Sequence, residues 1–268
     1  MKNWFITGTS RGFGRIWAEA ALRRGDRVVA TARNLDDLAP LVAQYGDRVA
    51  ALPLDVSDRA QVFETMAEGV ARFGRLDVIV NNAGYGHVGM VEEVTEADAR
   101  AQMDVNFFGA LWVIQAALPH LRAHKGGHLI TVSSIGGIVS FPTLSMYCAS
   151  KWGVEALCEA LAAEVQDQGI RVTLLEPSGY ATDFPTASAR HSTPLPAYDK
   201  AHAARAAARD KIQWSDPAPT ADVILNLVDM EHPPLRLLLG KSVLDRAVAA
   251  QSARESEWRA HADLTTAG

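Results

Sequence analysis

The stretch TGTSRGFG, from Thr7 to Gly14, decides the fold that the sequence predicts. It follows an apolar, strand-like run, NWFIT, and leads into RIWAEAALRRG, in which apolar residues recur at helical spacing. Glycine accepts backbone conformations that other residues avoid, so Gly8, Gly12 and Gly14 allow a tight turn between these two elements. Backbone N–H groups at a helix start, together with the positive end of the helix dipole, favour a phosphate. We therefore expect a nucleotide-binding turn on the first strand of a βαβ unit.

The alternation of short apolar runs with helix-period segments continues along the chain. A strand buried on both faces reads as an unbroken apolar run, which is typical of a parallel sheet covered by helices. The pattern predicts one α/β domain over residues 1–268, a doubly wound parallel sheet (Rossmann fold) with helices on both faces. Strands are expected at 3–7, 27–31, 49–54, 76–80, 128–133, 170–175 and 235–239, and helices at 13–24, 35–45, 58–73, 95–123, 147–168 and 217–230.

Two segments depart from this rhythm. Residues 177–216 hold several prolines and an alanine-rich piece, AHAARAAAR, at 201–209. A long connection with weak structure of its own inside a compact domain is usually functional, so we expect a substrate-binding lid there. Residues 241–268 form a polar tail that we expect to be helical.

Composition excludes several classes of protein. The formal net charge of −5 argues against nucleic acid as a partner. The longest apolar stretch, at 109–119, is too short to span a membrane, and the first residues leave no room for a secretory signal peptide. Cys148 and Cys158 lack the spacing of a zinc or redox site, so we expect two reduced packing residues and no metal. A cytoplasmic protein is the simplest expectation.

The end of the second expected strand indicates which nucleotide the glycine turn holds. An acidic residue at this position binds the ribose 2'-hydroxyl of NAD, whereas an arginine accommodates the 2'-phosphate of NADP. Arg33 stands at this strand end, and Arg11 in the glycine turn is placed to approach the same phosphate. The pair predicts NADP(H). Two alternatives remain open: both arginines are ordinary solvated side chains, or Asp36 or Asp37 takes the acidic role instead of capping a helix.

The stretch SSIGGIVSFPTLSMYCASK, from Ser133 to Lys151, contains residues suited to proton transfer. Tyr147 and Lys151 are four residues apart in a helical pattern, so both side chains emerge on one face. A nearby ammonium favours the phenolate and moves the tyrosine pKa toward neutral pH, where acid–base catalysis works best. An isolated Tyr-x-x-x-Lys spacing is common, however, and needs support from other motifs.

Taken together, the motifs resemble the short-chain dehydrogenase/reductase (SDR) family. The matches follow the family's order over residues 7–182: Thr7-Gly8-x-x-x-Gly12-x-Gly14, Asp55-Val56, Asn81-Asn82-Ala83-Gly84, Asn106, Ser134, Tyr147 and Lys151. The resemblance implies four catalytic roles: Ser134 hydrogen-bonds the substrate oxygen, Tyr147 gives or takes a proton, Lys151 binds the nicotinamide ribose and lowers the tyrosine pKa, and Asn106 helps hold a water of the proton relay. One departure is Pro177-Ser178-Gly179, where the family usually has Pro followed directly by Gly.

The resemblance also implies which residues contact the cofactor. These lie in the glycine turn, after the second, third and fourth strands, in the catalytic helix and after the sixth strand: Gly8, Ser10, Arg11, Gly12, Phe13, Gly14, Arg33, Asp55, Val56, Asn82, Ala83, Gly84, Tyr147, Lys151, Pro177, Gly179 and Thr182.

The residues between Ser134 and Tyr147 predict the character of the substrate pocket. They include Ile138, Val139, Phe141, Leu144 and Met146, with no arginine or lysine cluster to meet a phosphate or carboxylate. An uncharged, fairly apolar ketone or alcohol is therefore expected. The expected substrate contacts are Tyr85, Ser134, Phe141, Met146 and Tyr147, and we expect His87 to be a polar wall or an exposed residue instead of a proton carrier. YCASKWGVEALCEALA resembles the segment of 17β-hydroxysteroid and retinol-type dehydrogenases, which also favours a hydrophobic carbonyl compound.

The leading hypothesis is an NADP(H)-dependent carbonyl reductase or alcohol dehydrogenase. One alternative is a β-ketoacyl-type reductase or an epimerase that uses the same four residues. Another is a non-catalytic NADP(H)-binding sensor, but a sensor would be expected to have lost Tyr147 or Lys151. The family commonly assembles through the helices expected at 95–123 and 147–168, which implies a homodimer or homotetramer.

Overall fold

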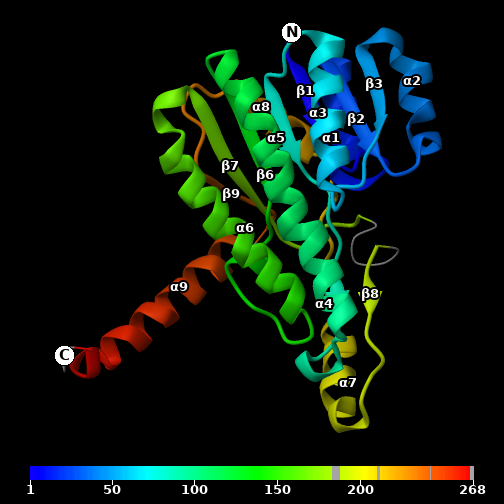
Figure 1. Ribbon diagram of the computed structural model, residues 1–268. Coiled ribbons are helices and arrows are strands. Elements are labelled where there is room, and N and C mark those ends of the chain that lie inside the picture. Colours follow the sequence, from blue (N-terminus) through cyan, green and yellow to red (C-terminus); the bar gives the residue numbers. More distant parts are fainter. Residues whose placement is uncertain (183–187, 210–211, 242, 266–268) are drawn as a thin grey trace.

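Seven parallel strands form the centre of the molecule (Figure 1). The computed structural model describes residues 1–182, 188–209, 212–241 and 243–265. The strand order is β3-β2-β1-β4-β6-β7-β9. The seven expected strands are confirmed, each within two residues of its predicted bounds: β1 (Asn3–Ile6), β2 (Arg27–Ala32), β3 (Val49–Pro53), β4 (Val78–Asn81), β6 (Gly127–Val132), β7 (Ile170–Pro177) and β9 (Arg236–Leu239).

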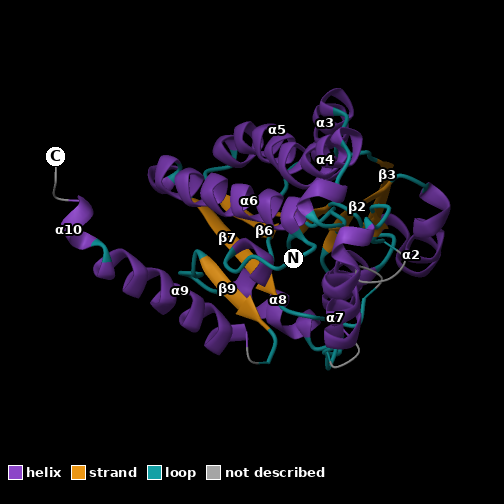
Figure 2. Ribbon diagram, turned by 90° about the horizontal axis from the view of Figure 1, so that it is seen from below, coloured by secondary structure: helices purple, strands orange, loops and turns teal. Residues whose placement is uncertain are grey.

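Helices cover both faces of this sheet, as Figure 2 shows from below. One face carries α1 (Gly12–Arg24), α2 (Ala39–Tyr45) and α8 (Thr220–Asp229); the other carries α3 (Arg59–Phe73), α4 (Glu96–Met103), α5 (Gly109–Ala123) and α6 (Ser145–Glu164). The strand order reverses between β1 and β4, and in open α/β sheets the crevice at such a point binds the ligand. The doubly wound Rossmann fold is thereby confirmed.

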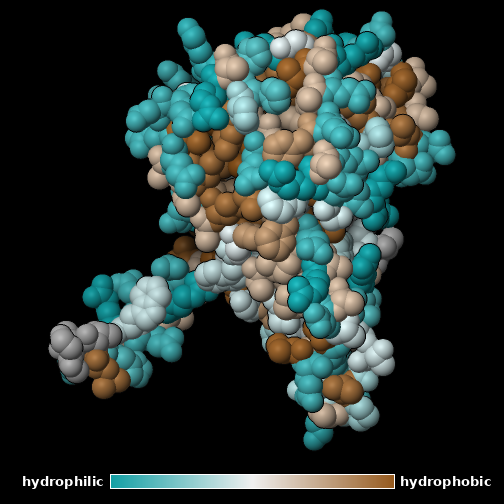
Figure 3. All heavy atoms as spheres, viewed as in Figure 1, coloured by the Kyte–Doolittle hydropathy of each residue, from teal (hydrophilic) through white to brown (hydrophobic). Residues whose placement is uncertain are grey.

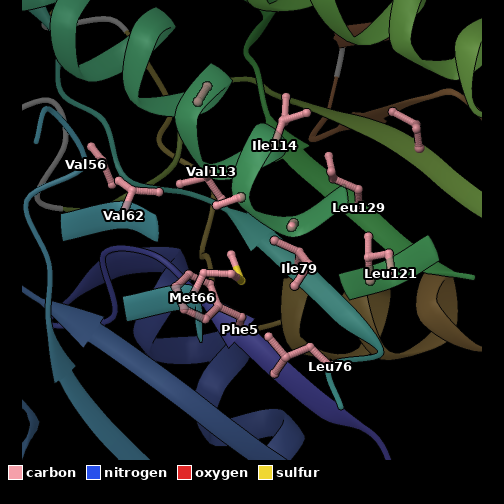
Figure 4. Packing of buried hydrophobic residues seen from close by; sticks show 14 of the residues in the cluster. Phe5, Val56, Val62, Met66, Leu76, Ile79, Val113, Ile114, Leu121 and Leu129 are labelled. Atoms are coloured by element: carbon pink, nitrogen blue, oxygen red, sulfur yellow. The ribbon is translucent and has the colours of Figure 1, made fainter. Parts of the chain in front are cut away.

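The alternation of side chains along each strand produces two apolar cores. Phe5 on β1 packs with Ile79 and Leu129 beneath α3, α5 and α6, and these residues are fully buried (Figure 4). Trp4 and Ile6, the neighbours of Phe5, point to the opposite face and pack beneath α1 and α8. Burial of both sheet faces explains why the strands read as unbroken apolar runs.

The expected helix at 95–123 differs from the structure in one respect. It is interrupted by a π-helical turn, η4 (Asp104–Phe108), between α4 and α5. Asn106 lies in this turn and is almost fully buried. Single π turns inside helices are frequent at functional sites, because the wider turn redirects a side chain. Here the turn directs the Asn106 amide toward the backbone of Tyr85.

The segment after β7 has more structure than its prolines suggest. Strand β8 (Arg190–His191) pairs in parallel with β5 (His87–Val88), and the alanine-rich piece forms α7 (Asp199–Arg209). The expectation of weak structure is therefore wrong for 188–209, whereas Pro185 lies outside the described residues. Backbone pairing with β5, which is only two residues long, fixes a segment that has no strand-like sequence.

The described part of the tail is largely helical, as expected. Helix α9 (Val243–Ala260) projects away from the sheet and is followed by α10 (Ala262–Thr265). On the face drawn in Figure 3, hydrophobic residues gather over α5 and α6. Phe108 on η4 and Trp152 on α6 are among the exposed large hydrophobic side chains. No helix in the described ranges is long and apolar enough to cross a membrane.

Candidate active site

The glycine turn between β1 and α1 is held by side-chain hydrogen bonds. Thr7 Oγ1 accepts from the backbone N–H groups of Asn82 and Ala83, each at 2.9 Å. Asn82 in turn donates from Nδ2 to the carbonyl oxygens of Thr7 (2.8 Å) and Gly8 (3.1 Å). Gly8 has a φ of +68°, a conformation that other residues rarely adopt. The asparagine turn after β4 thus fixes the shape of the glycine turn on β1.

A cleft of about 2070 Å³ opens at the carboxyl ends of the strands. It is large enough for a dinucleotide with a second small molecule beside it. Seventeen cofactor contacts were expected, and the cleft brings sixteen of them together: Gly8, Ser10, Arg11, Gly12, Phe13, Arg33, Asp55, Val56, Asn82, Ala83, Gly84, Tyr147, Lys151, Pro177, Gly179 and Thr182.

Gly14 is the cofactor contact that does not line the cleft. A Cβ atom built on Gly14 would lie 2.3 Å from the carbonyl oxygen of Gly8 and 2.6 Å from Asn82 Nδ2. Gly14 leaves no room for a side chain because α1 packs closely against the turn. Gly240 accommodates Ser178, the residue that stands between Pro177 and Gly179 where the family usually has none. A Cβ atom on Gly240 would lie 2.1 Å from Ser178 Oγ. The glycine after β9 thus makes room for the additional serine.

The end of β2 presents Arg33 to the cleft. Arg33 and Arg11 are both exposed and both line it, as expected for a pair that meets a 2'-phosphate. Asp36 and Asp37 lie in a 3-10 turn after β2 and are not among the lining residues. The N–H of Asp36 is capped by the Asn34 side chain at 3.2 Å. This geometry favours the helix-capping interpretation of the two aspartates over the acidic role.

Ser134 and Tyr147 meet at the floor of the cleft. Tyr147 lies in the first turn of α6 and is buried. Its side chain is hydrogen-bonded to that of Ser134. Burial raises the pKa of the Tyr147 phenol, and the Ser134 hydrogen bond only partly offsets this effect. The sequence predicted a lowered tyrosine pKa. The direction is opposite here because the desolvation of a phenolate outweighs the hydrogen bond that favours it.

Lys151 lies one helical turn beyond Tyr147 and is also buried. Its Nζ atom donates to the carbonyl oxygen of Val132 at 2.8 Å and lies 6.0 Å from the centre of the Tyr147 ring. Burial lowers the pKa of Lys151 to about 8, and the Glu155 carboxylate opposes this decrease. The ammonium is therefore fixed beside the phenol by the end of β6, which is the arrangement that the Tyr-x-x-x-Lys spacing predicted.

Asn106 contacts residues of the site but does not itself line the cleft. Its Oδ1 atom accepts from the N–H of Tyr85 (3.1 Å), and its Nδ2 atom donates to the Tyr85 carbonyl (2.9 Å) and to Ser150 Oγ (3.2 Å). A Cβ on Gly84 would lie 3.2 Å from Asn106 Oδ1 and 3.7 Å from Lys151 Nζ. Asn106 thus positions Tyr85, a lining residue, and approaches the lysine without touching the cleft.

The expected substrate residues are only partly brought together. Tyr85, Ser134, Phe141 and Tyr147 line the cleft, and so does Leu144. Met146 does not, because it precedes Tyr147 on α6 and leaves the helix about 100° further round. Ile138 and Val139 pack against α9 instead. His87 is buried and bonds Ser192 Oγ at 2.8 Å, so it joins β5 to the segment after β8 and does not form the cleft wall.

A buried acidic pair, missed in the sequence, lies beside Lys151. Glu155 follows Lys151 by one helical turn, and Glu176 ends β7; they are 5% and 1% exposed. Arg236 on β9 donates to Glu155 Oε2 at 2.9 Å, and the same nitrogen lies 3.6 Å from Glu176 Oε1. Burial and the Glu155 carboxylate raise the pKa of Glu176 to about 8. The spacing of Glu155 from Lys151 was a visible signal, but its pairing with Glu176 depends on the sheet.

The side chains that residues 188–209 contribute to the cleft differ in charge from those that follow Ser134. Ile135, Phe141 and Leu144 contribute apolar side chains to the cleft, as the sequence predicted, and Arg246 lies over the Phe141 ring, 6.0 Å from its centre. Positive side chains come from β8 and α7: Arg190, His191, Arg205 and Arg209. The absence of basic residues between Ser134 and Tyr147 therefore does not describe the whole pocket. This observation removes the ground on which an uncharged substrate was expected.

The family model described as short chain dehydrogenase matches residues 2–192, which include the glycine turn and the Ser134–Tyr147–Lys151 group. The chain belongs to the short-chain dehydrogenase family. It is 41% identical to oxidoreductase BOA17 of Botryotinia fuckeliana over 96% of this chain and 97% of that protein. The SDR resemblance of the sequence is thereby confirmed, and this SDR is an oxidoreductase by family.

Solved structures agree with this assignment. A short-chain dehydrogenase from Streptomyces avermitilis superposes with a TM-score of 0.92 at 39% identity, over 99% of this chain and 98% of that one. An alcohol dehydrogenase from Thermococcus sibiricus, solved with 5-hydroxy-NADP, has a TM-score of 0.75 at 28% identity, over 89% and 96%. Such neighbours carry nicotinamide cofactors both with and without the 2'-phosphate.

Proposed function

We propose that this SDR transfers a hydride between NADP(H) and the carbonyl or alcohol carbon of a small molecule. The observation that carries the proposal is the Ser134–Tyr147 hydrogen bond, beside the fixed Lys151 ammonium, in the cleft that also holds the glycine turn. The bound dinucleotide supplies the hydride donor or acceptor. The hydroxyls of Ser134 and Tyr147 hold the substrate oxygen, and Tyr147 gives it a proton during reduction or takes one during oxidation.

The raised pKa of Tyr147 fits the direction of reduction. A buried phenol that keeps its proton at neutral pH is ready to donate it to the oxygen of a carbonyl as negative charge develops there. The Lys151 ammonium, held by the Val132 carbonyl, stabilises the phenolate that remains. The intact Ser134–Tyr147 contact favours this enzymatic role over a non-catalytic sensor.

The proposal can be tested by mixing the protein with NADPH and a panel of aromatic and alicyclic ketones. Loss of the nicotinamide absorbance is expected with at least some of them. Binding of NADPH without oxidation across the panel would instead support the sensor. The same panel should include a β-ketoacyl thioester, since reduction of that compound alone would favour the β-ketoacyl reductase alternative.

We propose NADP(H) as the cofactor because Arg33 and Arg11 line the cleft and Asp36 and Asp37 do not. A guanidinium that contacts the 2'-phosphate makes a charge-assisted hydrogen bond. Reversing the charge with Arg33→Asp should lower the NADPH-to-NADH ratio of kcat/KM at least about tenfold. The matched control is Asp37→Asn, which should leave the ratio unchanged. An unchanged ratio in the arginine variant would mean that Arg33 does not meet the phosphate.

A homodimer or homotetramer, in the cytoplasm, remains part of the proposal. Apolar side chains exposed on η4 and α6, Phe108 and Trp152, support association through these helices. Light scattering of the purified chain gives the oligomeric state directly.

A further inference from the structure

The substrate half of the cleft has one charged side. Arg190, His191, Arg205 and Arg209 line it from β8 and α7, and we call these four residues the basic wall. In Figure 1, β8 and α7 are the yellow elements beside and below α4. Their place is fixed by hydrogen bonds to the segment after β4: Arg190 N–H donates to the Gly86 carbonyl, and Ser192 N–H donates to the Val88 carbonyl, each at 2.9 Å. The basic wall is therefore a built part of the cleft.

Arg205 is the central residue of the basic wall. Its side chain is about half-buried, and among the described residues it has neither a hydrogen bond nor an ion pair. Burial lowers the pKa of Arg205, and the neighbouring positive charge of Arg209 adds to this effect. A buried charge without a counter-ion destabilises the folded protein unless a ligand pairs with it. Arg205 is thus placed for a partner that the described residues do not supply.

The nearby carboxylates are engaged elsewhere. Glu93, in the turn before α4, accepts from His202 at 2.7 Å and from the Leu195 N–H at 2.9 Å through Oε1, so it holds α7 in place. Three aspartates line the cleft within the described ranges: Asp55, which bonds Ser57, Asp216, which caps the turn before α8, and Asp104, which is exposed near Tyr85. Among the described residues, none of these carboxylates pairs with Arg205.

Tyr85 extends the basic wall with a polar side chain next to Arg190. The Arg190 guanidinium lies over the ring of Tyr85, 4.9 Å from its centre, which keeps the arginine extended along the cleft. Burial raises the pKa of Tyr85, so its hydroxyl, which has no partner among the described residues, stays a hydrogen-bond donor at neutral pH. An arginine and a phenol side by side suit an oxyanion.

We propose that the substrate carries an anionic group, a carboxylate or a phosphate, which binds the basic wall while the carbonyl carbon lies at Tyr147. The inference rests on the proposed function, since it identifies the substrate class of the same site. A guanidinium matches the geometry of both anions and binds them through paired hydrogen bonds. The apolar lining residues Phe141 and Leu144 cover the part of the substrate between its anionic and reacting ends. The substrate is therefore an amphipathic keto or hydroxy compound.

Binding of matched pairs of compounds tests the proposal without relying on turnover. The protein is the Tyr147→Phe variant loaded with NADP⁺, and calorimetry gives the affinities. One pair is 4-oxo-4-phenylbutanoate and its methyl ester. The other is a β-ketobutyryl thioester of phosphopantetheine and the same thioester of pantetheine. The anionic member of at least one pair should bind about tenfold tighter or more, and the pair that shows the difference distinguishes a free carboxylate from a carrier phosphate.

The substitution Arg205→Gln should reduce this preference to about twofold or less, because it removes the unpaired charge. Lys200→Gln is the matched control, since Lys200 is exposed on the same helix and does not line the cleft; the preference should persist in it. In a protein that keeps Tyr147, the Arg205→Gln substitution should raise KM for the anionic ketone and leave kcat nearly unchanged.

Three results are decisive. Equal affinity for charged and neutral members of both pairs overturns the proposal, even where the enzyme reduces ketones. An Arg205→Gln variant that loses NADPH affinity instead of anion preference also overturns it, because the basic wall would then serve the cofactor. The protein could also prefer anions through Arg205 but oxidise NADPH with none of the probes. That result would support the anion site and refute only the proposed function.

Discussion

Replacing Glu176 by glutamine should make the protein more stable at mildly alkaline pH. Glu176 is buried beside Glu155, and its pKa is raised from 4.5 to about 8. The folded protein therefore keeps a proton on Glu176 that the unfolded chain loses above about pH 4.5. Stability falls as the pH rises through this window and changes no further above about pH 8. Glutamine has almost the same shape and does not titrate.

The size of the effect follows from the same shift. A single group changes the free energy of unfolding by at most about 1.4 kcal/mol per pH unit. We expect roughly half of this slope, because Arg236 also stabilises the ionised carboxyl and is itself partly exposed to solvent. Between pH 5 and pH 8 the wild type should thus lose about 2 kcal/mol more than the variant.

Urea unfolding at several pH values measures this difference. The matched control is Glu159→Gln, which removes an exposed partner of the same arginine and should change stability by less than about 1 kcal/mol at every pH. Parallel pH profiles for the wild type and the Glu176 variant would refute the reasoning. They would mean that Glu176 is ionised in the folded protein at neutral pH.

Two further predictions concern the cleft. In Gly14→Ala, the new Cβ would overlap the Gly8 carbonyl, so α1 must shift. The affinity for NADPH, measured by fluorescence titration, should therefore fall about tenfold or more. An unchanged affinity would show that the turn adapts to the new side chain. Burial opposes the ionisation of Glu93, but bonds from His202 and the Leu195 and Met90 N–H groups outweigh it and lower its pKa to about 2. Glu93→Gln should loosen α7 and raise KM for ketones several-fold, whereas the control Glu92→Gln, at an exposed residue, should not. Equal KM values for the wild type and the Glu93 variant would show that the docking of α7 does not affect substrate binding.

Most of the fold was predictable because it depends on local patterns. The strand of Phe5 and the helix after Gly14 are encoded by apolar runs and by glycine placement, and burial on both faces reinforces the same signal. The π turn at Asn106 and the two-residue strand β8 were not predictable. Both are set by hydrogen bonds to the segment around Tyr85, which is distant in the sequence.

The active site was also only partly predictable from the sequence. Ser134, Tyr147 and Lys151 could be found because α6 and the end of β6 place them within one short stretch of sequence. The basic wall could not, since Arg205 reaches the cleft only through the docking of α7 and β8. The direction of the Tyr147 pKa was also misjudged, because burial is a property of the folded chain.

The central claim is that Tyr147 transfers the proton in a nicotinamide-dependent redox step. The most direct measurement is kcat for NADPH-dependent ketone reduction by the wild type and by Tyr147→Phe, with NADPH affinity determined for both. We predict that kcat falls by about 10²- to 10⁴-fold while NADPH affinity stays within about fivefold. A phenylalanine variant that reduces the ketone at the wild-type rate would contradict the account.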